Sequence, residues 1–247
     1  RLLVLSGKGG VGKSTVAVNL ARSLAAQGKR VGLLDVDLHG PSLPTLLGIV
    51  GQDIEQEDGL LQPLICEGLR VISVGLMLAQ PDEAIIWRGP RKMSLIKQFI
   101  ENVAWGELDY LIVDCPPGSG DEPLSVCQTI AEPDGAILVT TPQEVALVDI
   151  RKSIGFCRKI GLPVLGLVEN FSGFVCPHCQ TATPIFDQGG GERLAAEQSI
   201  AFLGSIPLEP EIRAASDCGQ AFGDRRNAAV RAMEAVVRRV VAITERT

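Results

Sequence analysis

The sequence is poor in aromatic residues, in long apolar runs and in basic charge. Aromatic side chains make up only 4% of the 247 residues, so aliphatic side chains must pack the core. No stretch approaches the roughly 18 uninterrupted apolar residues of a membrane span, and no leader of charged, apolar and small residues precedes the first predicted strand. These absences predict a cytoplasmic protein that does not associate with membranes.

The net charge and the cysteine spacing argue against two further classes of protein, nucleic-acid-binding proteins and small disulfide-rich secreted proteins. A net charge of -6 argues against a large nucleic-acid interface, which would need a basic face to neutralise phosphates. The seven cysteines form an odd set in which only Cys176 and Cys179 make a close pair. This spacing does not resemble the disulfide framework of a small secreted protein. We therefore expect no nucleic-acid partner, and we expect reduced thiols in a reducing compartment.

Short apolar runs alternate with helical patterns along most of the chain. Hydrophobic residues make up 46% of the sequence. The runs predicted to be buried strands are 2–5, 31–36, 69–74, 110–114, 136–140, 164–169 and 201–206. Because runs such as 111–113 and 136–139 are continuous rather than alternating, helices should cover both faces of these strands, as in a parallel sheet. We expect a single doubly wound, mostly parallel α/β domain over residues 1–247.

Two segments, 51–68 and 227–244, differ from this pattern of alternating runs. Residues 51–68 are polar and contain glycines without a clear period, which predicts an excursion or a mobile loop. The last stretch, 227–244, carries one apolar helical face made of Ala229, Met233, Val236, Val240 and Ile243. We expect this helix to pack on the sheet; the alternative, suggested by its arginines, is a helix that lies on a membrane surface.

A glycine-rich loop follows the first predicted strand. Residues 7–14 match the pattern G-x-x-x-x-G-K-[ST] and precede a predicted helix from Lys13 to about Ala26, which is the context of a P-loop. Backbone N–H groups of such a loop face the phosphates, and the helix dipole favours the anion. Lys13 should reach the β- and γ-phosphates of ATP, and Ser14 should ligate Mg²⁺. The predicted nucleotide-binding residues are Gly7, Lys8, Gly9, Gly10, Val11, Gly12, Lys13, Ser14 and Thr15.

Lys8 is a second lysine, placed early in the loop where the phosphate cradle does not require one. This feature resembles the deviant Walker A class of P-loop ATPases. In that class the early lysine reaches across a dimer to the partner's nucleotide. The resemblance therefore implies ATP bound between two subunits and a catalytic role for Lys8, whereas the alternative is a solvated lysine.

Aspartates end two predicted strands at the sheet edge that also carries the P-loop. Asp37 is the candidate that orients the attacking water, and Asp35 is the candidate that holds a Mg²⁺-bound water. Asp114 ends an apolar strand in a Walker B pattern and should hold a magnesium water as well. The turn 115–118 can sense the γ-phosphate, and residues 118–121 can move with hydrolysis. The alternative for Asp35 and Asp37 is a turn or capping role.

The pair Cys176 and Cys179 follows a predicted strand and should lie on an exposed knuckle within residues 170–187. A C-x-x-C pair can form a redox disulfide, half a zinc site, half an iron-sulfur site or two inert thiols. A twofold dimer would bring two pairs together and supply the four thiolates that a [4Fe-4S] cluster or tetrahedral zinc needs. The ligand count favours such a bridged dimer, with His178 as a solvated spacer. Packed or incidental thiols are expected at Cys66, Cys127, Cys157 and Cys218.

Several motifs together resemble the Mrp family of P-loop ATPases, which includes ApbC-like proteins and eukaryotic cytosolic scaffolds. The segments that carry this resemblance are 7–15, 35–37 with 40–42, 87–89, 114–118, 169–170 and 176–179. The resemblance implies ATP hydrolysis and a homodimer or a heterodimer with a related P-loop subunit. It also implies a labile [4Fe-4S] cluster, bridged by the two cysteine pairs and passed to apo iron-sulfur proteins.

The same resemblance implies that Asn170 reads the adenine edge and that Pro207 and Arg213 lie near the base and ribose. Cys115 departs from the family pattern, in which we expect threonine. Two other interpretations stay open. A positioning ATPase similar to MinD or ParA would leave the cysteine pair unexplained, and a zinc-bridged dimeric ATPase would use nucleotide turnover for conformational control.

Overall fold

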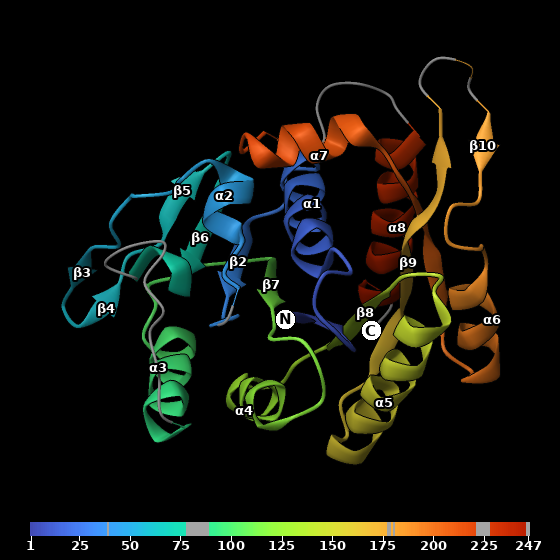
Figure 1. Cartoon of the computed structure of the whole chain (residues 1–247). Helices are drawn as coiled ribbons and strands as arrows, with labels where there is room; N and C mark the ends of the chain where they lie inside the picture. The colour runs from blue at the N-terminus through green and yellow to red at the C-terminus, as the bar shows by residue number, and fades with distance from the viewer. Residues whose placement is uncertain (39, 78–88, 177–178, 180, 221–227, 246–247) are drawn as a thin grey trace.

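A mostly parallel β-sheet runs through the centre of the molecule, with helices on both sides (Figure 1). The computed structural model describes all residues except 39, 78–88, 177–178, 180, 221–227 and 246–247. The strands of the main sheet are β1 (Leu2–Ser6), β2 (Val31–Asp35), β5 (Leu64–Cys66), β6 (Leu69–Ser73), β7 (Tyr110–Asp114), β8 (Gly135–Thr140), β9 (Val164–Val175), β10 (Ala182–Thr183) and β11 (Phe202–Leu208).

The sheet order is β10-β9-β8-β1-β7-β2-β6-β5, and β11 pairs with β9. Among the strands that the structure describes, the pairs β9–β10 and β5–β6 are antiparallel and the other pairs of this sheet are parallel. Every residue of β1, β2 and β8 is buried, as their continuous apolar sequences predict. The expected doubly wound sheet is therefore confirmed.

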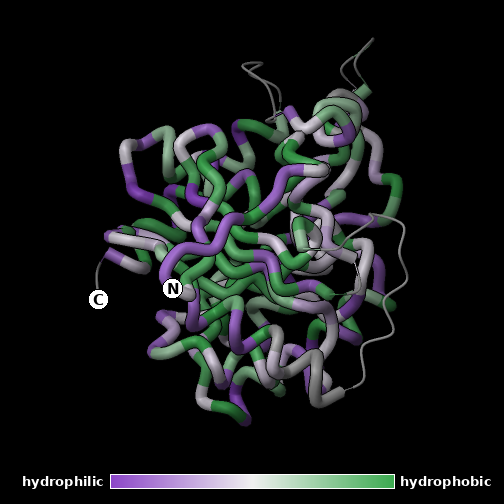
Figure 2. The backbone as a smooth tube through the Cα atoms, turned by 90° about the vertical axis from the view of Figure 1, so that its left-hand side faces the viewer, coloured by the Kyte–Doolittle hydropathy of each residue, from purple (hydrophilic) through white to green (hydrophobic). Residues whose placement is uncertain are grey.

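Helices cover the two faces of the sheet. They are α1 (Lys13–Ala26), α2 (Leu43–Leu47), α3 (Gly89–Glu101), α4 (Asp121–Thr129), α5 (Glu144–Ile160), α6 (Gly190–Glu197), α7 (Pro210–Asp217) and α8 (Ala228–Thr244), with a 3-10 turn η1 (Val74–Met77). One apolar core lies under α1, α2 and α8, and a second lies under α3 to α6. Figure 2 shows the hydrophobic segments concentrated in the interior.

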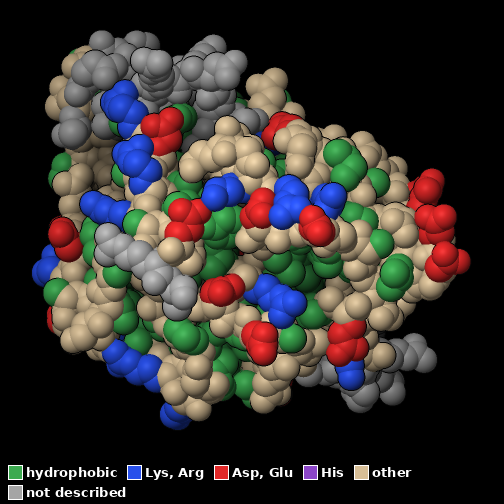
Figure 3. Space-filling model, turned by 180° about the vertical axis from the view of Figure 1, so that it is seen from behind, with side chains coloured by type: hydrophobic (Ala, Val, Ile, Leu, Met, Phe, Trp, Pro, Cys, Tyr) green, Lys and Arg blue, Asp and Glu red, His purple; other side chains and the backbone are tan. Residues whose placement is uncertain are grey.

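The C-terminal helix α8 packs on the sheet as predicted. Ala229, Met233, Val236 and Val240 are buried, and Ile243 packs against the same core at the helix end. Nowhere in the described part of the chain is a helix both long enough and apolar enough to span a membrane. On the back of the molecule acidic and basic side chains are interspersed over the centre, and acidic side chains gather at the right-hand rim (Figure 3).

Residues 51–68 differ from the expected loop because they contain one tight hairpin and the first strand of a second. The strands β3 (Gln56–Glu57) and β4 (Leu60–Leu61) form one, and β5 with β6 forms the other. Both residues of Asp58-Gly59 and of Glu67-Gly68 have positive φ, from 51° to 82°. Two successive positive φ values are typical of the type I′ turn that joins antiparallel strands. The dipeptides Asp58-Gly59 and Glu67-Gly68 therefore indicate these hairpins in the sequence.

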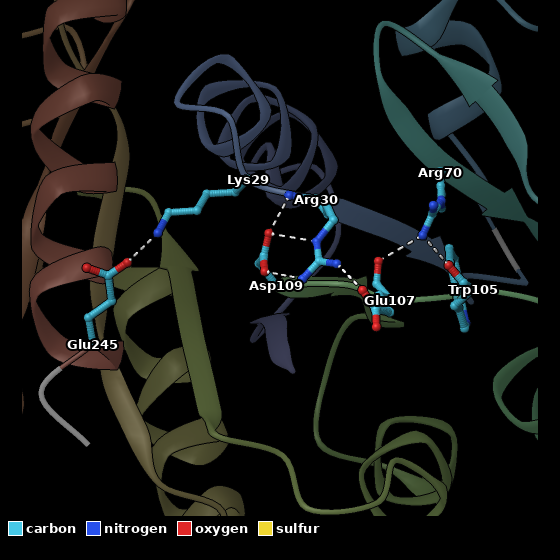
Figure 4. Close-up of polar contacts among 7 residues, drawn as sticks. All are labelled: Lys29, Arg30, Arg70, Trp105, Glu107, Asp109 and Glu245. Atoms are coloured by element: carbon cyan, nitrogen blue, oxygen red, sulfur yellow. Dashed lines mark hydrogen bonds and ion pairs between the residues drawn. The ribbon is translucent and has the colours of Figure 1, made fainter.

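Ion pairs fasten the sheet edge at which β2 begins (Figure 4). Arg30 donates to both carboxylate oxygens of Asp109, at 3.2 and 2.8 Å, and also contacts Glu107. Lys29 pairs with Glu245, just beyond α8, at 2.7 Å. The hydrogen bond from Arg30 lowers the pKa of Asp109 to about 2. Because these contacts are exposed, each should contribute little to stability.

Glu169 joins strand β9 to helix α6. Its side chain is fully buried, and Oε1 accepts hydrogen bonds from Ser172 Oγ at 2.6 Å and from the Gly189 N–H at 3.2 Å. Oε2 accepts one from the Gly191 N–H at 2.6 Å. A carboxylate is favoured here because it meets the N–H groups at the start of a helix. Glu169 therefore holds α6 against the strand that leads to Cys176.

We predict that Glu169→Gln lowers the free energy of unfolding by about 1–3 kcal/mol, because an amide nitrogen cannot accept these buried hydrogen bonds. Urea denaturation followed by circular dichroism measures the change. Glu192→Gln is the matched control, since Glu192 lies exposed in the first turn of α6. The control should shift stability by less than about 0.5 kcal/mol. Equal effects of the two variants would contradict the anchoring role of Glu169.

Candidate nucleotide site and cysteine hairpin

The P-loop connects β1 to α1 and is shaped by close contacts as well as by its glycines. Gly12 has a φ of 81°, and a Cβ at this position would overlap the side-chain amide of Asn170. A Cβ at Gly7 would overlap the backbone of Asp149 in α5. Because both positions need glycine for space, and Gly12 also for its backbone conformation, the predicted loop is fixed between α5 and β9.

A cavity of about 380 Å³ opens beside this loop. The residues that line it are Ser6, Lys8, Gly9, Gly10, Gly12, Lys13, Ser14, Thr15, Asp37, Gly40, Ser42, Leu46 and Pro117. Of the nine predicted nucleotide-binding loop residues, Gly7 and Val11 do not line it, and Val11 is buried in the core. A larger cavity of about 490 Å³, lined in part by Trp105 and Tyr110, contains none of the predicted site residues.

Lys13 brings a buried positive charge to this cavity. Its side chain is only 6% exposed, and Nζ lies 2.6 Å from Asp114 Oδ1 and 3.6 Å from Asp37 Oδ2. Burial by itself would lower the pKa of Lys13, but the attraction of Asp114, followed by that of Asp37, raises it above the ordinary value. The ammonium therefore stays charged, as phosphate binding requires.

Asp35 lies at the end of β2, between Ser73 of β6 and Asp114 of β7 in the strand register. Its Oδ1 accepts a hydrogen bond from the Asp37 N–H at 3.0 Å, and its Oδ2 accepts one from Ser73 Oγ at 2.8 Å. Burial, followed by the charge of Asp114, raises the pKa of Asp35 to about 7. Each oxygen of Asp35 therefore has a protein partner, and its predicted contact with a magnesium water stays a prediction.

Asp114 is fully buried at the end of β7. Its Oδ1 pairs with Lys13, whereas its Oδ2 accepts no hydrogen bond from any residue whose position is described. Burial raises the pKa of Asp114, and Lys13 opposes that shift. A buried acceptor of this kind needs a donor, and a water bound to Mg²⁺ would be one. The unpaired Oδ2 and the nearby hydroxyl of Ser14 therefore fit the predicted oxygen ligand set.

Lys8 lies half-exposed on the rim of the cavity. Its carbonyl accepts a hydrogen bond from Ser6 Oγ at 3.0 Å. Among the residues with described positions, none makes a hydrogen bond or ion pair with its ammonium. The side chain therefore differs from Lys13, whose charge is neutralised inside the same subunit.

Asn170 lies against the P-loop, and its Nδ2 donates to the Val11 carbonyl at 2.9 Å. The next residue, Phe171, has a φ of 57° and reaches the space beside Gly12. In this geometry Asn170 braces the loop, and its contact with adenine stays a prediction. Pro207 lies nearby, because Ile206 of β11 pairs with Asn170. Arg213 belongs to α7, but its side chain lies outside the described positions, as do residues 87 and 88.

The two close cysteines lie on a hairpin that extends β9. The strand runs to residue 175, beyond the predicted end at 169, and pairs antiparallel with β10. The Cys176 N–H donates to the Thr181 carbonyl at 3.1 Å, and Cys179 Sγ donates to Thr181 Oγ1 at 3.3 Å. When the Thr181 hydroxyl donates to the sulfur instead, this hydrogen bond, with help from Cys176, lowers the pKa of Cys179 and favours its thiolate. His178 lies outside the described residues.

The hairpin alone does not complete a metal site. Within the described ranges, no group of three or more histidine, cysteine, aspartate and glutamate side chains could hold a metal ion. All seven cysteines are free thiols. Cys127 and Cys157 are buried in the core, as expected for packed thiols, and Cys115 is buried there too. Burial raises the pKa of each. Cys179 is exposed and Cys176 half-exposed, in agreement with the predicted knuckle.

The strand order, the loop between β1 and α1, and the aspartates that follow β2 and β7 define a P-loop NTPase of the MinD and ParA type, a class that hydrolyses ATP. The solved cell-division ATPase MinD of Pyrococcus furiosus has this fold, with a TM-score of 0.74, 22% identity and 98% of both chains covered. The family model described as NUBPL iron-transfer P-loop NTPase matches residues 1–241, and the chain belongs to that family.

Three similar proteins share the sequence of this chain as well as the fold, with identities from 40% to 52%. The cytosolic Fe-S cluster assembly factor NUBP2 of Bos taurus is 52% identical over 226 residues, which cover 90% of this chain and 83% of that protein. The iron-sulfur cluster carrier protein of Methanocaldococcus jannaschii is 48% identical over 220 residues, covering 89% and 76%. A nucleotide-binding protein of Archaeoglobus fulgidus, solved with ADP, has a TM-score of 0.80, 40% identity and coverage of 91% and 88%.

We predict that Lys13→Ala weakens binding of Mg-ADP about a hundredfold or more, because the variant lacks the buried cation that meets the phosphates. Isothermal calorimetry measures the affinity, and circular dichroism checks the fold. Lys8→Ala is the control: it also removes a lysine that lines the cavity, and it should leave the affinity of an isolated subunit nearly unchanged. Unchanged affinity in Lys13→Ala would show that the nucleotide binds elsewhere.

Proposed function

We propose that this protein is an ATP-hydrolysing carrier that binds a [4Fe-4S] cluster between two subunits and transfers it to apo iron-sulfur proteins. The observation that carries the proposal is the exposed pair Cys176 and Cys179, which extends from the same strand that braces the P-loop. A positioning ATPase has no use for such a pair. The names of the bovine and archaeal relatives, an assembly factor and a cluster carrier, support this function and a cytoplasmic location.

The ligand count supports a shared cluster. Each chain presents two accessible thiols on the hairpin, and a [4Fe-4S] cluster takes four thiolates. A second copy, or a related P-loop subunit, supplies the other pair across a twofold axis. The lowered pKa of Cys179 helps this assembly, since the thiolate is the form that binds iron.

The roles at the nucleotide site follow from charge and position. Lys13 meets the β- and γ-phosphates, and Lys8 reaches the nucleotide of the other subunit from its position on the cavity rim. Asp37, whose carboxylate lies at the cavity, orients the attacking water. Ser14, Asp114 and Asp35 would hold Mg²⁺, in part through water, and the ion would neutralise phosphate charge. Hydrolysis is slow and serves cluster binding or release.

We predict that anaerobic reconstitution with iron and sulfide yields a brown protein with the Mössbauer spectrum of a [4Fe-4S] cluster. Cys176→Ser and Cys179→Ser should each abolish stable binding, because thiolates are the soft ligands that iron requires. Both variants should bind Mg-ADP with parental affinity. Cys218→Ser is the matched control, since Cys218 is also exposed but lies outside the hairpin.

Two results would contradict the cluster proposal. A colourless protein that binds zinc through Cys176 and Cys179 would favour a zinc-bridged dimer. A cluster that survives both serine substitutions would separate the hairpin from cluster binding.

We predict that Lys8→Ala and Asp37→Asn each abolish most ATP turnover as homodimers. Mixing the two variants should restore activity, because one site of the mixed dimer then combines its own Asp37 with Lys8 of the partner. Random mixing should return about one quarter of the parental rate. Phosphate release measures turnover, and each variant mixed with parental protein controls for subunit exchange. No recovery despite exchange would exclude action of Lys8 across the dimer.

A further inference from the structure

A buried chain of hydrogen bonds links strand β6 to the backbone of Asp37. Ser73, the last residue of β6, is fully buried. Its Oγ accepts a hydrogen bond from the Gly75 N–H at 3.1 Å and donates to Asp35 Oδ2 at 2.8 Å. Asp35 Oδ1 in turn accepts the Asp37 N–H at 3.0 Å. Because Gly75 occupies an acceptor position on the Ser73 hydroxyl, the hydroxyl proton is left to point at Asp35.

These hydrogen bonds hold Asp37, which lines the cavity beside the P-loop. The Oδ2 of Asp37 lies 3.6 Å from Lys13 Nζ. Ser73 and Asp35 do not line the cavity, and the hydrogen bond that Asp35 accepts from the Asp37 N–H connects them to it. An aspartate side chain is short, and its carboxylate position follows the position of its backbone. The hydrogen bond that Asp35 accepts therefore helps to set where the Asp37 carboxylate lies.

A second contact leads from the same turn to the segment after Asp37. A Cβ at Gly75 would lie 2.8 Å from Pro41 Cβ and 3.2 Å from Pro44 Cγ, so the turn after β6 touches this segment without a side chain between them. Gly40, whose N–H donates to Asp37 Oδ1 at 3.3 Å, also lines the cavity. The turn after β6 thus supports Pro41 and Pro44 from one side.

We propose that Ser73 is a positioning residue for ATP hydrolysis, which acts through Asp35 to hold Asp37 in place; this rests on the proposed role of Asp37. Removal of the Ser73 hydroxyl leaves Asp35 Oδ2 as a buried acceptor without a donor. The carboxylate then turns toward another donor and loosens its bond to the Asp37 backbone. Hydrolysis depends on the position of Asp37, whereas nucleotide affinity depends mainly on the P-loop and Lys13. The effect therefore falls on kcat and not on binding.

The test compares Ser73→Ala with the parent in steady-state phosphate release and in calorimetry with Mg-ADP. The expected result is a kcat about tenfold lower, with the Kd of Mg-ADP changed by less than about twofold. Ser153→Ala is the control, because Ser153 is a buried serine of α5 whose Oγ has no hydrogen-bond partner in the part of the chain that the structure describes. Its kcat should equal that of the parent. Parental kcat in a folded Ser73→Ala protein would overturn the proposal.

A double variant separates a positioning role from a general structural one. Ser73→Ala should slow the parent but should not further slow Asp37→Asn, since the residue that it positions is already inactive. An equal loss of rate in both backgrounds would overturn the proposal. If Ser73→Ala does not fold, Ser73→Cys replaces it, because a thiol is a weaker donor of similar shape. Its kcat should lie below the parental value, and a parental kcat would overturn the proposal. Parental turnover in Asp37→Asn would instead overturn the role of Asp37 itself.

Discussion

The buried ion pair between Lys13 and Asp114 is the interaction on which the nucleotide site depends. Its two partners come from different strand-loop units, and both are almost completely removed from solvent. Removing one partner of such a pair leaves a buried charge uncompensated, at a cost of about 3–5 kcal/mol. The pair therefore holds the start of α1 at the end of β7. Asp35 and Asp37 approach the same ammonium from β2, so three segments meet around a single charge.

The strand order explains why these groups meet. In the spatial strand order β1-β7-β2-β6, the adjacent strands β7, β2 and β6 end in Asp114, Asp35 and Ser73. The parallel register aligns these three residues. Parallel strands end at a common edge, so polar end residues collect there while the apolar residues before them fill both cores. The two hydrophobic clusters therefore position the site without contributing polar atoms to it.

Local signals in the sequence predicted the parts of the site that lie close together along the chain. The P-loop pattern and the helix from Lys13 to Ala26 were found with correct bounds, because glycine spacing and helical periodicity are local. The hydrogen bonds from Ser73 to Asp35 and from Asn170 to Val11 join residues 38 and 159 positions apart. They depend on strand order, which a single sequence does not reveal. The short hairpins at 56–61 and 64–73 were not predicted from the sequence, although their turn dipeptides are present.

Phe171 has a positive φ in the middle of β9, at an irregularity in the pairing with β11. On one side of it Asn170 holds the P-loop, and on the other the strand continues to Cys176. Six residues of strand span about 20 Å when extended, so Asn170 and Cys176 lie at the two ends of this segment. A displacement of this backbone would therefore act on the P-loop and on the cysteine hairpin together. Because side chains alternate along a strand, adding or deleting one residue here would turn the cysteines to the opposite face of the hairpin.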